Sequence, residues 1–169
     1  MRPAILILCI TIGTTFCFRS EISAAENVSV SVPLPSDEPL KLELLNNPKG
    51  LVRTANTISQ EQLTIPSLWW AKENSQNKLL DNWIAYPATK INPGRVDLIV
   101  NEQIWTLLDY LERYNFVNYF GGVVRSNKYN MRVFNYQKEL LATYTCNFQT
   151  IQPLCQIKMN TQNLLEISF

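Results

Sequence analysis

The side chains that usually carry enzyme chemistry are sparse in this chain, because it contains no histidine. A Ser-His-Asp triad, a Cys-His pair and a His-ligated zinc or copper site are therefore excluded. Any general acid–base chemistry would rest on carboxylates, lysine or tyrosine. We therefore expect no catalytic residue, no metal site and no cofactor, and we favour a non-enzymatic protein.

The acidic side chains offer one enzymatic alternative. Asp81, Asp97 and Glu102 are expected near the ends of strands, and Asp109 and Glu112 are three residues apart on one predicted helix. Paired carboxylates hydrolyse glycosides when they lie across the scissile bond. A carboxylate-dependent hydrolase therefore stays as an alternative, although Asp109 and Glu112 are more simply explained as the solvent-facing side of an amphipathic helix.

Adjacent tryptophans raise the possibility of an aromatic binding surface. Neighbours on a helix point about 100° apart, so one apolar stripe rarely covers both rings. Leu68 and Ala71 place Trp69 nearer the apolar side, which predicts that Trp69 is core and that Trp70 is the candidate binding ring. Trp105 flanks the apolar stripe of the next predicted helix and could join either group.

A basic stretch is the second candidate binding surface. Arg125, Lys128, Arg132 and Lys138 follow one another with no acidic residue between Gly121 and Lys138. They could form a solvated face, or Arg125, Lys128 and Arg132 could dock an acidic protein or acidic lipid headgroups as a peripheral membrane contact. A third possibility is intramolecular, with the acidic N-terminal arm lying over the stretch.

The N-terminus has the pattern of a signal peptide over residues 1–25. Arg2 precedes an apolar run over Ala4–Phe18, and the small residues Ser23-Ala24-Ala25 suit a cleavage site. The run is shorter than the about 20 residues of a membrane-spanning helix. Cleavage would remove two of 15 basic and one of 14 acidic side chains, which leaves a neutral chain and predicts no nucleic-acid partner.

Cysteine usage agrees with export. Cys9 and Cys17 lie in the predicted signal peptide, so Cys146 and Cys155 remain as an even pair. Both are expected on the apolar faces of adjacent strands, and we predict a structural disulfide between them. The alternative is a redox-active pair, although such pairs usually lie closer together, as Cys-x-x-Cys at a helix start.

The pattern of the chain predicts an irregular arm over residues 26–60, rich in proline, and a single α+β domain over residues 61–169. Two or three helices should pack on one face of a four- to six-stranded antiparallel sheet. The expected elements are a helix capped by Thr64, strands over 79–86 and 95–101, and a C-terminal meander that ends in Leu164–Phe169. A helical region over 101–126 is also expected, with Ile104, Leu107, Leu108 and Leu111 as its apolar stripe and with a kink or restart near Asn115. Gly121-Gly122 either breaks this region or permits close packing.

Three segments resemble a family of small exported proteins of cyanobacteria. They read IPSLWWAKE…KLLDNWIAYP, VDLIVNEQIWTLLDYLERYNFVNYFG and YNMRVFN…LLATYTCNF, and they cover Leu63–Phe148. The resemblance implies the periplasm or the thylakoid lumen and carries over no catalytic residue. We therefore expect an exported binding or accessory protein for an unknown protein or small ligand, with a small-ligand carrier on the concave face of the sheet as an alternative.

Overall fold

The computed structural model describes residues 31–57, 64–74 and 78–160. The predicted signal peptide, the predicted boundary at residue 60 between arm and domain, and the predicted last strand over Leu164–Phe169 lie outside these residues. They therefore stay predictions.

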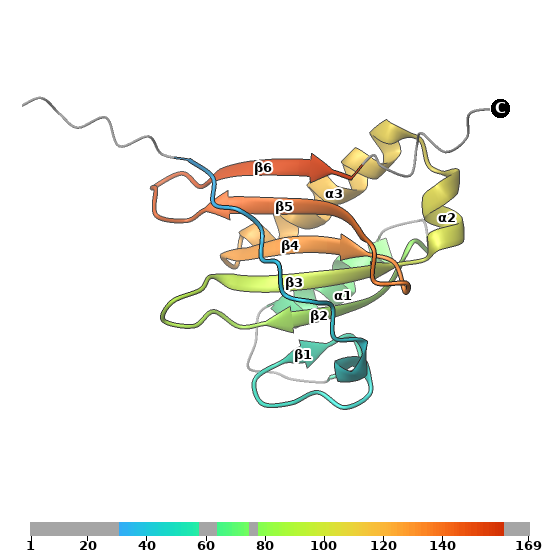
Figure 1. The fold of residues 1–169 in the computed structure, drawn as a ribbon, viewed down its shortest axis with the longest axis horizontal. Coiled ribbons are helices and arrows are strands. Elements are labelled where there is room, and N and C mark those ends of the chain that lie inside the picture. Colours follow the sequence, from blue (N-terminus) through green and yellow to red (C-terminus); the bar gives the residue numbers. More distant parts are fainter. Residues whose placement is uncertain (1–30, 58–63, 75–77, 161–169) are drawn as a thin grey trace, which may run out of the picture.

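The described residues form one six-stranded sheet in which every strand lies beside its sequence neighbour (Figure 1). The strands are β1 (Arg53–Thr54), β2 (Leu80–Tyr86), β3 (Gly94–Val100), β4 (Tyr129–Phe134), β5 (Leu140–Asn147) and β6 (Leu154–Met159). The helices are the 3₁₀ helix η1 (Leu42–Leu45) and the α-helices α1 (Thr64–Asn74), α2 (Glu102–Leu107) and α3 (Tyr110–Arg125). The α+β fold class is thus confirmed.

One pair of strands corrects the prediction of a wholly antiparallel sheet. β3 and β4 are parallel, whereas the other four neighbouring pairs are antiparallel. The connection between β3 and β4 contains both α2 and α3, and such a crossover returns the chain to the end of the sheet at which β3 began. The predicted meander of β4, β5 and β6 is confirmed.

The two faces of the sheet are covered by different parts of the chain (Figure 1). Helices α1 and α3 pack against each other on one face, and α3 contacts β4, β5 and β6. The N-terminal segment Ser31–Lys41, called the arm below, crosses the other face from β6 towards β1. Strand β3 is consequently buried along its whole length.

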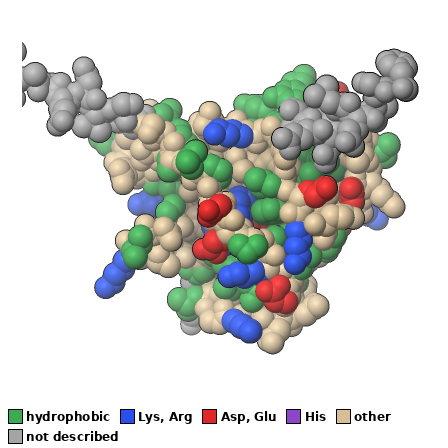
Figure 2. Space-filling view, viewed as in Figure 1, with side chains coloured by type: hydrophobic (Ala, Val, Ile, Leu, Met, Phe, Trp, Pro, Cys, Tyr) green, Lys and Arg blue, Asp and Glu red, His purple; other side chains and the backbone are tan. Residues whose placement is uncertain are grey.

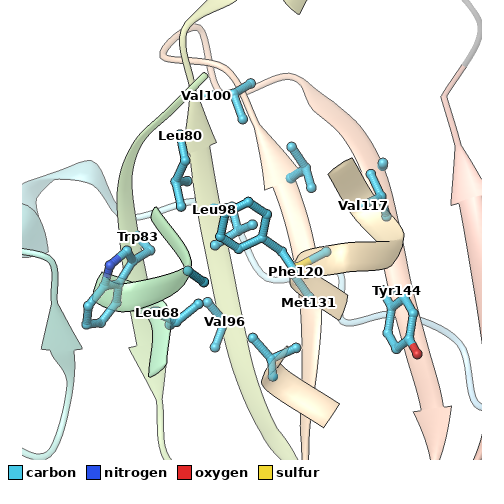
Figure 3. Close-up of a cluster of buried hydrophobic side chains, with 14 of the residues drawn as sticks. Leu68, Leu80, Trp83, Val96, Leu98, Val100, Val117, Phe120, Met131 and Tyr144 are labelled. Carbon is cyan, nitrogen blue, oxygen red and sulfur yellow. The ribbon is translucent and has the colours of Figure 1, made fainter. Parts of the chain in front are cut away.

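The main core lies between the helices and the sheet (Figure 3). Strand alternation directs Val96, Leu98 and Val100 towards the helices, and helical spacing directs Val117 and Phe120 towards the strands. A smaller core on the arm face joins η1 and the arm to the sheet. Its buried members are Leu40, Leu44, Leu45, Ile84, Ile99 and Phe134.

Gly121 allows the closest approach between α3 and the sheet. A Cβ atom at this position would overlap the ring of Tyr144 on β5, whereas a Cβ atom at Gly122 would have no neighbour within 4 Å. The glycine pair therefore does not break the helix. Its first member permits close packing, which was one of the two roles the sequence left open.

The helical region between β3 and β4 is interrupted just before Asp109, and not near Asn115 where the sequence predicts a kink or restart. Asp109 caps α3 in a capping box: its carboxylate accepts from the Glu112 amide at 2.8 Å, and Glu112 Oε2 accepts from the Asp109 amide at 2.8 Å. The prediction of one continuous stripe was wrong, because the break turns Leu107 and Leu111 outwards, with 83% and 63% of their surfaces exposed.

A bulge in β2 changes which side chains share a face of that strand. Leu80 pairs with Val100 and Asn82 pairs with Ile99, so Asp81 is an extra residue in the ladder. Leu80 therefore shares the helix face with Trp83, where simple alternation would separate them. Ile84 lies on the opposite, arm-facing side.

The predicted disulfide is confirmed. Cys146 on β5 and Cys155 on β6 are directly opposite each other in the antiparallel register and are bonded. The bond joins the last two described strands of the sheet on their helix-facing side. Disulfides of this kind persist in oxidising compartments.

Replacing both cysteines by alanine is expected to lower the free energy of unfolding by about 2.5 kcal/mol, because a short loop is no longer closed in the unfolded chain. Thermal unfolding followed by circular dichroism measures the effect. The wild-type protein in reducing agent should show the same lowered midpoint. An unchanged midpoint in both would contradict a stabilising role.

No α-helix among the described residues is long and apolar enough to cross a lipid bilayer.

Candidate functional site

Both rings of the tryptophan pair lie on the outside of α1. Trp69 is 41% exposed and Trp70 is 68% exposed, whereas Leu68 and Ala71 are fully buried. The expectation that Trp69 is core was wrong. Residues 68 and 71 lie three apart and form a narrow buried stripe, and the two residues between them then point away from it. Trp70 remains accessible, as the sequence suggested.

Trp105 is a packing residue at the junction of α2 and α3. It is 5% exposed, its ring meets Phe116 edge to face at 6.0 Å, and the Arg113 guanidinium lies 5.5 Å from its ring centre. Arg113 Nε also donates to the Trp105 carbonyl at 3.1 Å. The structure therefore does not bring Trp105 together with Trp70 as an exposed surface.

The basic stretch does not form one surface. Arg125 is exposed at the end of α3, and Lys128 is exposed in the following turn, at a positive φ of 61°. Arg132 instead lies on β4 with 3% of its surface exposed, facing the arm. Arg132 is thus separated from Arg125 and Lys128 and belongs to a different site.

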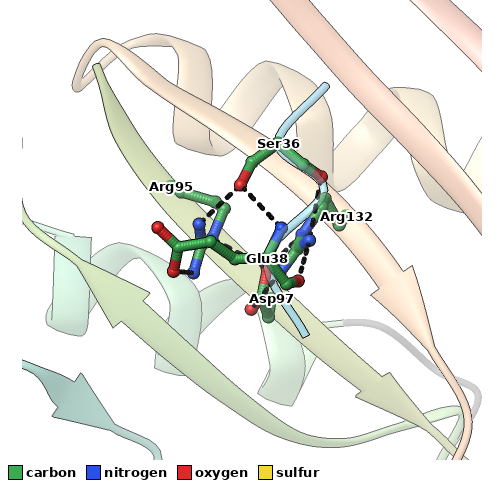
Figure 4. A network of polar contacts seen from close by, with 5 residues as sticks. All are labelled: Ser36, Glu38, Arg95, Asp97 and Arg132. Carbon is green, nitrogen blue, oxygen red and sulfur yellow. Dashed lines mark hydrogen bonds and ion pairs between the residues drawn. The ribbon is translucent and has the colours of Figure 1, made fainter. Parts of the chain in front are cut away.

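The centre of that site is a buried ion pair between neighbouring strands (Figure 4). Asp97 on β3 is directly opposite Arg132 on β4 in the parallel register. Arg132 Nε donates to Asp97 Oδ1 and Nη2 donates to Oδ2, both at 2.8 Å. Asp97 has no exposed surface. This is a bidentate carboxylate–guanidinium ion pair, the strongest arrangement that these groups form.

Arg132 also holds the arm in place. Its Nη1 donates to the backbone carbonyls of Ser36 and Glu38, at 2.9 and 2.6 Å (Figure 4). The intramolecular possibility raised by the sequence is therefore confirmed for this arginine, because the acidic arm lies over it. Arg132 thus binds backbone carbonyl groups of the arm rather than its carboxylates.

Arg95 is the second cation beneath the arm. Its Nη1 donates to Ser36 Oγ at 2.8 Å, and its Nη2 donates to Glu38 Oε2 at 3.2 Å. Its Nε lies 3.4 Å from Asp97 Oδ1 but has no hydrogen-bond partner among the described residues. The Arg95 side chain is 11% exposed, and that of Glu38 is 52% exposed.

A cleft of about 530 Å³ opens beside this network. We call it the arm cleft. One wall is arm segment 33–38, another is loop 91–93 between β2 and β3, and the floor consists of residues at the ends of β3, β4 and β5. Arg95, Arg132 and Thr145 line it, and the Thr145 hydroxyl is buried without a partner among the described residues. Figure 2 shows acidic and basic side chains interspersed on this face of the molecule.

Tyr86 lies next to the network on β2. The Arg95 guanidinium covers its ring at 4.2 Å from the ring centre. Burial of the phenol, and secondly the negative charge of Asp97, raise the pKa of Tyr86 to about 12, although Arg95 and Arg132 oppose the shift. Its hydroxyl has no hydrogen-bond partner among the described residues.

Stability is expected to fall as the pH rises from 10 towards 12. The unfolded chain loses the Tyr86 proton near pH 10, whereas the folded chain keeps it until about pH 12, so the proton stabilises the folded state below pH 10 and this contribution disappears above it. Because Tyr86 is only partly buried, we expect the free energy of unfolding to fall by about 1 kcal/mol. Urea unfolding at pH 9 and 11.5 measures it. Tyr86→Phe should show a smaller loss, and equal losses would contradict the assignment.

Three of the five acids of the hydrolase alternative have a structural partner. Both oxygens of Asp97 are bonded to Arg132, and Asp109 and Glu112 bond each other's backbone amides. Among the described residues no group of three or more His, Cys, Asp or Glu side chains could hold a metal ion. Asp97, Asp109 and Glu112 therefore have structural roles among the described residues.

Arg95 was not among the predicted site residues. Arg132 was grouped with Arg125 and Lys128, from which the structure separates it. A signal for Arg95 was present: Arg95 and Asp97 alternate with Val96 and Leu98, and Ile99 adds an apolar residue on the charged face, a pattern that indicates a strand covered on both sides. Charged side chains in such a strand need partners.

Comparison of the chain with protein-family models, with curated proteins and with solved structures gives no match.

Proposed function

We propose that this chain is a non-enzymatic binding protein whose ligand occupies the arm cleft. One observation carries the proposal: a cleft of about 530 Å³ opens onto two arginines that are almost completely buried. Clefts of about 300–1,000 Å³ with a few convergent polar groups are the usual form of small-molecule sites. This favours the small-ligand alternative over an accessory protein that docks through its basic stretch.

The chemistry of the cleft supports binding rather than turnover. Asp97 accepts two hydrogen bonds from one arginine and is inaccessible, so it is poorly placed to take a proton from a substrate. Glu38 is half exposed and bonded to Arg95. What the cleft offers is a set of fixed donors, and fixed donors orient ligands.

The proposed location is an exported compartment, the periplasm or the thylakoid lumen. Three features support it: the signal-peptide pattern of residues 1–25, the Cys146–Cys155 disulfide, and the resemblance to exported cyanobacterial proteins. Fractionation of cells that produce the tagged chain would test this part. Recovery of full-length, uncleaved protein from the cytoplasm would contradict it.

A fragment screen by NMR tests the binding function without knowledge of the natural ligand. Several hundred small soluble compounds are added to the ¹⁵N-labelled protein. Hits should shift the amides of Gly94, Thr145 and Phe148 at the cleft, and leave Val117 and Phe120 on the helix side unchanged. Hits that gather on the helices, or no hits at all, would overturn the proposal.

A further inference from the structure

We infer that the ligand of the arm cleft carries a carboxylate, and that this group binds Arg95 in the place now taken by Glu38. The inference rests on the proposed function, since it names the class of ligand for the same cleft. It follows from how the charges beneath the arm are paired.

Arg95 and Arg132 share one buried anion. Asp97 gives both of its oxygens to Arg132 at 2.8 Å, and approaches Arg95 only at 3.4 Å without a hydrogen bond. Among the described residues, the other acid in contact with Arg95 is Glu38, through a single bond of 3.2 Å. A guanidinium that is 11% exposed needs an anion nearby, so the position of Glu38 is an anion site.

Glu38 is an exchangeable occupant of that position. Its side chain is 52% exposed, and half-exposed ion pairs contribute about 0–1 kcal/mol. Its backbone, by contrast, is held separately, because the Glu38 carbonyl accepts from Arg132 at 2.6 Å. The carboxylate can therefore rotate into solvent while the arm stays bound, and an external carboxylate can take the Arg95 Nη2 hydrogen bond.

The walls of the cleft specify what accompanies the carboxylate. Leu34 on the arm and Ile91 in the loop between β2 and β3 both line it, and they are 83% and 90% exposed. Prolines 33, 35 and 93 and Phe148 add further apolar surface. An acid with an apolar body would cover these side chains while its head group reaches Arg95.

Glu38 then acts as an internal competitor. An external carboxylate must displace it, so the observed affinity is lower than the intrinsic affinity of the site. Removing the Glu38 charge should raise the affinity for acids and leave the affinity for neutral analogues unchanged.

The test compares 1-naphthylacetate with 1-naphthylacetamide, which share the apolar body and differ in charge. Both are titrated by NMR into the wild-type protein, Glu38→Gln, Arg95→Gln and Arg95→Lys. Wild type should bind the acetate about 10-fold more tightly than the amide, as expected for one charge-assisted hydrogen bond. Glu38→Gln should tighten acetate binding by about 2- to 5-fold. Arg95→Gln should abolish the preference for the acetate over the amide, and Arg95→Lys should keep part of that preference.

Glu43→Gln is the matched control, because Glu43 is an exposed acid of η1 outside the network. If Glu38→Gln and Glu43→Gln tighten acetate binding equally, the cause is the general loss of negative charge. Glu38 would then not be an internal competitor. Equal binding of acetate and amide at the cleft amides would overturn the ligand class and leave the binding function standing. If neither probe shifts the cleft amides, the inference fails, and the fragment screen decides separately on the binding function. Amide spectra of the Arg95 variants show whether they are folded.

Discussion

Replacement of Asp97 by asparagine is expected to lower the free energy of unfolding by about 3–5 kcal/mol, the usual effect of breaking a buried ion pair. The change leaves Arg132 buried, at 3% exposure, without its counter-charge. It also removes the closest buried anion from Arg95, 3.4 Å away. Urea unfolding, followed through tryptophan fluorescence to which the fully buried Trp83 contributes, measures the loss.

Two comparison variants identify the cause of this loss. Glu38→Gln removes a half-exposed charge from the same network and should cost less than about 1 kcal/mol. Asp97→Leu combined with Arg132→Met removes both charges of the pair and should recover much of the stability, because a buried ion pair can often be replaced by apolar side chains of similar size. If the double variant is as unstable as Asp97→Asn, the loss does not come from an unpaired charge.

Replacement of Gly121 by alanine is expected to destabilise the protein by about 3 kcal/mol or more, at the upper end of the range for overpacked cores. The added methyl group would overlap three atoms of the Tyr144 ring, which is 4% exposed. This steric cost exceeds the gain of about 1 kcal/mol that alanine brings to a helix. Thermal and urea unfolding measure the net effect.

Gly122 provides the matched control on the same helix. Alanine at this position meets no atom within 4 Å, so Gly122→Ala should raise stability by up to about 1 kcal/mol through helix propensity alone. Tyr144→Ala in the Gly121→Ala background should cost less than Tyr144→Ala alone, because the overlap is relieved. Additive effects of the two changes would contradict a direct clash.

Periodicity carried most of the fold prediction. Val96, Leu98 and Val100 alternate, and Val117, Phe120 and Val124 recur at helical spacing, and all six pack in the main core. Apolar residues alone could not locate the break at Asp109, since Leu107, Leu108 and Leu111 continue the helical pattern across it. The Asp-x-x-Glu spacing of the capping box was the available signal, and it is local.

The candidate site was harder to predict because it depends on register. Asp97 and Arg132 are 35 positions apart, and they meet only because β3 and β4 pair in parallel with these residues opposite each other. A shift of one residue would move Arg132 to the helix face. The hydrophobic pattern of the two strands and the connection between them set such a register, and it cannot be read from Asp97 and Arg132 alone.

The arm has a consequence for the order of events during folding. Its bonds to β4 and β5 join residues 94 and 96 positions apart at Arg132, and 116 positions apart at Asn147. Chains are synthesised from the N-terminus, so the arm emerges first, while the strand that binds it emerges almost 100 residues later. Contacts of such long range form slowly. We therefore expect the arm to dock last, onto a sheet that has already assembled, and the closing of the cleft to be the final step by which the protein becomes native.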